Sequence, residues 1–219
     1  MSPNEIWPYG TMIISRFPCN YYQYKFKTKM HRSLILTEAC LPQRLIVATS
    51  HFESMKESYA VRCEQLETTL KLLNSDEGFA GNSVVVGDFN FQALKAGERD
   101  KFMKTPDSNQ VDHEEKVILK AGYEDVMHHF VGEDAFTYRA TKPGESNKRI
   151  DKVVMQRSET ITNKNSAWRC ASAKILGSES RLKYEELGEL ADKVNEDGIV
   201  RTPSDHLAIL AELTCGTTK

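Results

Sequence analysis

The run Ser83–Gly87 is the feature that most restricts what this chain can fold into, because three consecutive valines are followed directly by glycine. A short run of β-branched residues is typical of a strand buried on both faces, and glycine is typical of the point where the chain turns out of a sheet. Six further runs have strand-like composition: Gly10–Ser15, Ser33–Ala39, Arg44–Ser50, Arg149–Gln156, Cys170–Leu176 and Leu207–Leu213. Strands of this kind need cover on both sides, so the sequence predicts a single α/β domain rich in sheet.

An amphipathic helix is predicted after the run Arg44–Ser50. Ser54 and Glu57 have the spacing of a capping box, which marks a helix start. Apolar side chains then recur at the spacing of one helix face: Tyr59, Cys63, Leu66, Leu70 and Leu73. We expect this face to pack on the sheet and the helix to end within Asn74–Gly78. A second helix is predicted over Asp112–Ala121, with Gly122 as its stop.

Length and composition restrict the class of protein. A chain of 219 residues with 27% charged residues and a net charge of −2 is ordinary for one soluble globular domain. No apolar run approaches the roughly 18 residues of a membrane helix, so no membrane partner is expected. The five cysteines are scattered and never form a CxxC pair. This favours reduced thiols in an intracellular protein and argues against zinc.

Four short motifs each lie at an end of a predicted strand. They are TSH (Thr49–His51), GDFN (Gly87–Asn90), RID (Arg149–Asp151) and SDH (Ser204–His206). Each is common by itself, whereas the ordered set is far more specific. Residues two apart in extended chain share a face, so we expect Asp88 and Asn90 to project together from the strand's carboxyl end. Open α/β sheets keep their sites at that edge.

The side chains of these motifs are the types that phosphodiester hydrolysis requires. Carboxylates hold a divalent cation that neutralises developing charge, and a carboxylate beside the attacking water can take its proton. Histidine and asparagine can donate hydrogen bonds to phosphoryl oxygens. The candidates are His51, Asp88, Asn90, Asp205 and His206. Asp151 can hold the imidazole of His206 in one tautomer.

The segment before Thr37 is basic. No acidic residue occurs between Ile6 and Thr37, and in YYQYKFKTK the lysines alternate with Tyr24, Phe26 and Thr28. An extended conformation would form a basic row that could lie along a phosphate backbone. A solvated strand face over an aromatic core explains the pattern equally well.

The ordered motif set resembles that of the endonuclease/exonuclease/phosphatase superfamily with the DNase I-like fold, over nearly the whole chain. Three stretches are similar to the 5′-tyrosyl-DNA phosphodiesterases within it: Thr28–Leu36, Thr49–Ser54 and Ala60–Leu66. The resemblance implies a four-layer sandwich, with two mixed β-sheets flanked by helices and incomplete at the N-terminus. Residues 1–215 would be one N-terminally truncated domain and 216–219 a C-terminal tail.

The same resemblance implies an activity. Members of this group are hydrolases that remove tyrosyl adducts from DNA 5′ ends during the repair of DNA damage and leave a 5′ phosphate. It implies Mg²⁺, or Mn²⁺, as the only cofactor, and a location in the nucleus and/or cytoplasm. RNA is a further candidate partner, and the oligomeric state stays open.

The resemblance also implies a role for each motif residue. Asp88 would be the base that orients the attacking water, and Asp205 would belong to the metal environment. The residues implied to bind the phosphate are His51, Asn90 and His206, with Asp151 and Ser204 supporting His206. Further candidate substrate-binding residues are Lys29, Arg32 and Tyr138, the last in a segment similar to the group's Thr-Trp segment.

Two features differ from the pattern of that group. The superfamily has an earlier strand that ends in Gln-Glu, whose glutamate is the principal magnesium ligand, and this pair is not found ahead of GDFN. After GDFN the group continues Asn-Leu-Arg-Asp, whereas Phe91–Ala93 follow here. Two alternatives therefore stand: a catalytically silent fragment or isoform that at most binds nucleic acid, and the same fold acting on RNA or a phosphoinositide.

Overall fold

The strands of the protein form two sheets. The structure is a computed structural model that describes residues 10–75, 82–95, 98, 113–140, 145–157, 160–161, 167–176 and 206–215. The larger sheet has the order β1-β2-β3-β4-β6-β5, and the smaller one pairs β7 with β8. The strands are β1 (Cys19–Lys25), β2 (Ser33–Ala39), β3 (Leu45–His51), β4 (Ser83–Asp88), β5 (Tyr123–Asp125), β6 (Asp151–Gln156), β7 (Trp168–Leu176) and β8 (Ala208–Cys215). The helices are η2 (Lys56–Ser58), α1 (Tyr59–Asn74), α3 (His113–Lys120) and η3 (Val126–His129).

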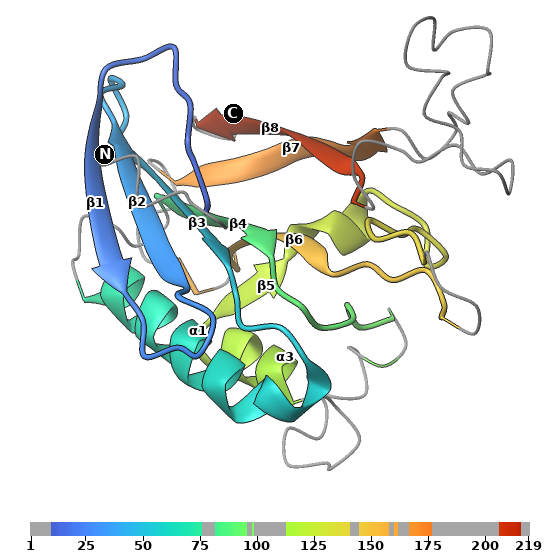
Figure 1. The fold of residues 1–219 in the computed structure, drawn as a ribbon. Helices are drawn as coiled ribbons and strands as arrows, with labels where there is room; N and C mark the ends of the chain where they lie inside the picture. The colour runs from blue at the N-terminus through green and yellow to red at the C-terminus, as the bar shows by residue number, and fades with distance from the viewer. Residues whose placement is uncertain are drawn as a thin grey trace, which may run out of the picture.

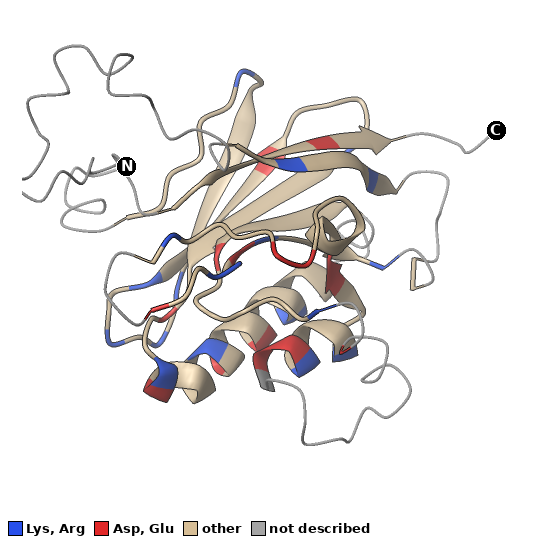
Figure 2. Ribbon diagram, turned by 90° about the vertical axis from the view of Figure 1, so that its right-hand side faces the viewer, with Lys and Arg blue, Asp and Glu red and all other residues tan. Residues whose placement is uncertain are grey.

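The larger sheet is covered on both faces (Figure 1). Helices α1 and α3 lie against one face, where Leu34, Val85 and Val154 pack on Leu66 and other helix residues. The β7–β8 sheet lies against the other face and closes a second apolar cluster. The predicted α/β class, with two packed sheets and helices outside, is confirmed. In Figure 2 charged residues colour the two helices blue and red, while most of the strand surface is tan.

The predicted strands are present with one exception. Gly10–Ser15 is not a strand, and Met12 and Ile14 are 59% and 83% exposed. Apolar composition alone was misleading there, because a strand also needs a neighbour to pair with. The neighbour of β2 is instead β1 (Cys19–Lys25), whose residues beyond Cys19 are all exposed. Its tyrosines are exposed, and Tyr24 contacts Phe26, which packs on the buried ring of Phe52.

Helix α1 differs from its prediction at the start. The capping box was wrong, because η2 precedes the helix and Ser58, its N-cap, makes no side-chain capping bond. Ser54 instead accepts a hydrogen bond from Arg32. The predicted apolar face is buried from Cys63 onward, but Tyr59 is 51% exposed. Helix α3 follows its prediction closely, and Gly122 lies after it with a φ of +85°. No helix in the described part of the chain is long and apolar enough to cross a membrane.

Gly87 must be glycine for steric reasons, and this gives a stability prediction. Its φ is +143°, and a Cβ added to it would lie 2.2 Å from the backbone oxygen of Ser50 in the neighbouring strand. We expect Gly87→Ala to lower the free energy of unfolding by about 3 kcal/mol or more, from backbone strain and overpacking together. Urea unfolding measures this loss. Gly132→Ala is the control, because nothing lies within 4 Å of its added Cβ, and an equal loss in both variants would contradict the steric explanation.

Candidate active site

The strand register places three motif residues in one row at the carboxyl end of β4. His51 of β3 is the parallel partner of Asp88, and Asp151 of β6 is the antiparallel partner of Asp88. Residues paired across neighbouring strands lie about 5 Å apart and project from the same face. The sheet itself therefore brings TSH, GDFN and RID together.

A fourth residue joins this row from outside the large sheet. His206 lies just before β8, and its Nδ1 is 2.8 Å from the Oδ2 of Asp151. Its Nε2 faces the Oδ2 of Asp88 at 3.8 Å, and the Nε2 of His51 approaches the same oxygen at 3.3 Å. The Asp88 carboxylate is thus the centre on which both imidazoles converge. Ser204 and Asp205 lie outside the described residues.

The spacing of Asp88 and Asn90 predicted that both project from an extended strand, and this was wrong. Asn90 instead reaches Asp88 through a turn. Strand β4 ends at Asp88, and Asn90 has a φ of +56°, a conformation that asparagine tolerates better than most residues. The Asn90 backbone N–H donates to the Oδ1 of Asp88 at 2.8 Å, and its side-chain amide donates to the Phe52 carbonyl at 2.9 Å. These bonds fix Oδ1 and leave Oδ2 directed toward the histidines.

Asp151 and His206 are positioned by the segment that resembles the group's Thr-Trp segment, a role that the sequence did not predict. The buried hydroxyl of Thr137 accepts hydrogen bonds from the backbone N–H groups of Ile150 and Asp151, at 3.1 and 3.0 Å. The Thr137 carbonyl accepts from the backbone N–H of Leu207, next to His206. The ring of Tyr138 contacts the His206 ring edge-on at 5.5 Å between centroids. The predicted substrate residue Tyr138 therefore lies at the site.

Lys29 and Arg32 lie on a loop that a buried carboxylate holds beside the site. Glu53 is fully buried and accepts from the Thr28 hydroxyl at 2.5 Å and from the Lys29 backbone N–H at 3.1 Å. The Arg32 guanidinium donates to the Ser54 hydroxyl at 3.0 Å. Nothing in the sequence distinguished Glu53 as this loop anchor, because its partners on the loop are 24 and 25 residues away. The Lys29 side chain is exposed.

Burial shifts the pKa values of the two central groups in opposite directions. Desolvation raises the pKa of Asp88 to about 6, with nearby Asp151 adding to the rise and the Asn90 hydrogen bond opposing it. Desolvation, together with the charge of Arg32, lowers the pKa of His51 to about 4. Near neutral pH, Asp88 is an ionised base of raised strength and His51 is uncharged.

These two shifts predict an unusual pH dependence of stability in the metal-free chain. The contribution of Asp88 to the free energy of unfolding is fully present below pH 3.8 and is lost as the pH rises through about 6. The contribution of His51 is fully present above pH 6.5 and is lost as the pH falls through about 4. The two offset each other between these limits. When the pH is lowered from 7 to 4.5, we expect the free energy of unfolding of His51→Gln to rise by about 1 kcal/mol relative to that of the unsubstituted chain. The effect is this small because the His51 side chain is partly exposed. Urea unfolding in chelator measures this, and the same difference at both pH values would contradict it.

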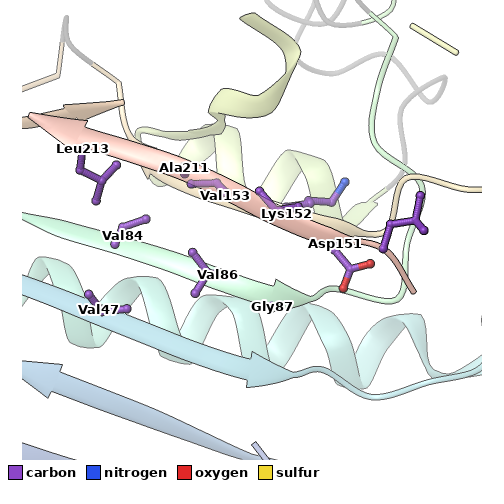
Figure 3. Close-up of a pocket in the computed structure, with 11 residues that line it drawn as sticks. Val47, Val84, Val86, Gly87, Asp151, Lys152, Val153, Ala211 and Leu213 are labelled. Atoms are coloured by element: carbon purple, nitrogen blue, oxygen red, sulfur yellow. The ribbon is translucent and has the colours of Figure 1, made fainter. Parts of the chain in front are cut away.

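An apolar pocket of about 370 Å³ lies between the two sheets beside this site. Figure 3 shows Val84 and Val86 of β4 on one side and Ala211 of β8 on the other, with the Asp151 carboxylate at one end. Burying a phosphate among these side chains would leave its charge unsolvated. The charged part of a substrate therefore belongs at the polar edge formed by Asp88, Asp151 and the histidines.

The polar edge also has donors for a metal ion. Asp88, Asp151 and His206 each offer one ligand atom, and these atoms lie within 4.8 Å of one another. Two carboxylates side by side suit a hard divalent cation, which prefers oxygen ligands. The residue types present at the site therefore fit a divalent metal.

Comparison with known proteins supports this fold. No protein-family model matches the chain, and no curated protein matches it in sequence. The structure resembles TDP2 of D. rerio in complex with a single-strand DNA product, with a TM-score of 0.51, 20% identity and coverage of 90% of this chain and 68% of that one. It also resembles truncated TDP2 of Caenorhabditis elegans, with a TM-score of 0.54, 18% identity and coverage of 88% and 64%.

A bacterial structure has a similar relationship to the chain. An endonuclease/exonuclease/phosphatase protein of Beutenbergia cavernae matches with a TM-score of 0.57 and 16% identity, over 92% of this chain and 46% of that one. At these identities the likeness concerns the fold. The chain therefore has the DNase I-like fold of the endonuclease/exonuclease/phosphatase proteins, as its motifs predicted.

Proposed function

We propose that the chain is a metal-dependent phosphodiesterase that hydrolyses 5′-phosphotyrosyl bonds on DNA. The observation that supports this best is the convergence of His51 and His206 on one oxygen of Asp88, with Asp151 hydrogen-bonded to His206. This arrangement combines a base with a raised pKa and two imidazoles beside it. Attack of water on a phosphodiester needs both kinds of group.

Asp88 is the proposed base. Its Oδ1 is held by the Asn90 backbone, so its Oδ2 is the oxygen that takes the proton of the attacking water. Water adds to phosphorus, the bond from phosphorus to the tyrosyl oxygen breaks, and the phenolate leaves and takes up a proton. The DNA retains the 5′ phosphate. A pKa of about 6 makes Asp88 a stronger base than an ordinary carboxylate while leaving it ionised near pH 7.

The imidazoles are proposed to bind the phosphate. Because a carboxylate only accepts, the contact with Asp151 places a proton on the Nδ1 of His206 and fixes the ring, and a second proton on Nε2 lets it donate to a phosphoryl oxygen. The Asn90 amide donates one hydrogen to the Phe52 carbonyl and has a second to offer a phosphoryl oxygen. Ser204 is proposed to support His206. The residues proposed to contact the DNA strand are Lys29, Arg32 and Tyr138, which lie on the loops around the site.

The proposed metal is Mg²⁺, or Mn²⁺, near the carboxylates of the site, with Asp205 as a ligand. When bound, such an ion neutralises charge on the phosphoryl oxygens and stabilises the leaving oxygen. DNA is proposed as the partner because a neighbour of this fold, TDP2 of D. rerio, was crystallised with a single-strand DNA product. Repair of DNA adducts would place the protein in the nucleus.

The test is hydrolysis of a 5′-phosphotyrosyl oligonucleotide by the 219-residue chain with Mg²⁺ or Mn²⁺, with release of tyrosine and a 5′-phosphorylated strand as products. His206→Ala should reduce the rate, whereas Asp134→Asn, which changes an exposed carboxylate outside the proposed site residues, should not. Equal activity in the chain and in His206→Ala would overturn the mechanism. Parallel reactions with RNA and with a phosphoinositide test the same site on other phosphoesters. Binding of the oligonucleotide without hydrolysis would support the silent alternative.

A further inference from the structure

A second cluster of metal-binding side chains lies at the far edge of the larger sheet. Glu124 of β5 and the consecutive residues His128 and His129 of η3 each offer one ligand atom, all within 4.8 Å of one another. The Nε2 of His128 is 3.9 Å from one Glu124 oxygen, and the Nε2 of His129 is 3.7 Å from the other. Sequence patterns did not predict this cluster, because the spacing of these residues matches no common metal motif.

The cluster is preorganised by buried bonds around Asp125. The guanidinium of Arg149 forms an ion pair with the Asp125 carboxylate, and both residues are buried. The same carboxylate accepts from the backbone N–H of Met127 at 3.2 Å and caps η3. These bonds fix η3 against β5, so His128 and His129 are held beside Glu124.

The Asp125 backbone also determines which nitrogen of His128 can bind a metal. The Nδ1 of His128 makes a hydrogen bond with the Asp125 carbonyl oxygen, which can only accept. The proton therefore lies on Nδ1, and Nε2 faces Glu124. A hydrogen bond from the second ring nitrogen to a backbone carbonyl is the usual partner of a metal-bound histidine.

We propose that Glu124, His128 and His129 bind Zn²⁺. Two imidazoles and one carboxylate suit Zn²⁺, whereas Mg²⁺ prefers ligand sets made of oxygen. Donors of a tetrahedral zinc site are about 3.3 Å apart when each bond is about 2.0–2.1 Å. The two imidazoles face different oxygens of Glu124, at 3.7 and 3.9 Å, and the three ligand atoms lie within 4.8 Å of one another, so a metal would draw them together. The half-exposed His129 side chain can rotate to allow this. Three protein ligands leave a fourth position for water.

This site is separate from the candidate active site. Glu124 is paired with Met155, four residues along β6 from Asp151, which corresponds to about 13 Å of strand. A zinc ion bound there would join β5 to η3 without touching the histidines of the active site. The proposal therefore does not depend on the phosphodiesterase function.

The proposal is tested by measuring zinc binding to the 219-residue chain. The affinity is obtained by competition with a chromogenic chelator in a phosphine reductant. Glu124→Gln and His129→Ala should each weaken binding by at least about tenfold, because loss of even an outer-shell partner has effects of 10–100-fold. Two controls should retain the affinity: His31→Asn, which removes an exposed histidine elsewhere, and the double variant Asp151→Asn/His206→Asn, which removes the other cluster. Co²⁺ bound to the unsubstituted chain should show the intense visible absorption of a four-coordinate site, and that absorption should disappear in His129→Ala.

Two outcomes would overturn the proposal. Equal zinc affinity in the unsubstituted chain, Glu124→Gln and His129→Ala would show that the cluster is not a ligand set. A loss confined to the Asp151→Asn/His206→Asn variant would place the zinc at the candidate active site. Circular dichroism of the metal-free variants checks that each remains folded. His129 is the preferred position for the substitution, because its exposed side chain can be truncated without opening the core.

Discussion

Asp88→Asn is expected to slow phosphodiester hydrolysis by about 10²–10⁴-fold, the range for loss of a positioned general base. The same change should stabilise the metal-free chain. Burial raises the pKa of Asp88 from 3.8 to about 6, so at pH 7.5 the ionised carboxylate destabilises the folded state, and removing its charge should add about 1–3 kcal/mol. Initial rates and urea unfolding in chelator measure the two effects.

The geometry explains why asparagine should fit at this position. Its oxygen can still accept from the Asn90 backbone, as Oδ1 does now. Its amide can donate to the Nε2 of His51, whose lowered pKa keeps it uncharged. The control is Asp134→Asn, the same change at an exposed site, which should leave both rate and stability unaltered. A variant that loses activity and stability together would show a structural role for Asp88 and contradict this prediction.

Asp151→Asn is expected to reduce the rate by about 10²-fold or more without unfolding the chain. Asp151 accepts from the Nδ1 of His206, whereas an asparagine amide can donate to that nitrogen and favour the other tautomer. The ring would also lose the carboxylate charge that stabilises it when both nitrogens carry protons, the form that can donate to Asp151 through Nδ1 and to a phosphoryl oxygen through Nε2 together. Rates at saturating and limiting substrate separate the effect on kcat from that on KM, and urea unfolding reports the stability.

The metal dependence of the rate distinguishes two explanations for such a loss. If Asp151 acts by orienting His206, the Mg²⁺ concentration for half-maximal rate should be the same in Asp151→Asn and in the unsubstituted chain. A large increase in that concentration would show that Asp151 acts as a metal ligand, and would reject the orienting role. His206→Ala combined with Asp151→Asn should be no slower than His206→Ala alone, because the two residues act as one unit.

Local sequence patterns predicted most of the sheet. The runs Ser33–Ala39 and Ser83–Gly87 each contain three consecutive apolar residues, because both faces of these strands are covered, and they coincide with β2 and most of β4. Patterns failed where pairing and not composition decides the structure. The exposed, polar β1 is a strand because β2 is beside it, whereas the apolar Gly10–Ser15 has no such partner among the described residues.

The sequence by itself determined which chemistry this protein can support and at which strand ends it lies. The motif residue types, and the glycine that follows the valine run, were readable from local order, whereas the steric reason for that glycine, the Ser50 backbone of the neighbouring strand, was not. The tertiary structure alone decided how the groups meet. Strand register aligned His51 and Asp151 with Asp88, burial shifted the pKa of Asp88, and η3 brought two histidines to Glu124. The physical reason is that register, desolvation and hydrogen bonding arise between segments far apart in the chain, where no local pattern records them.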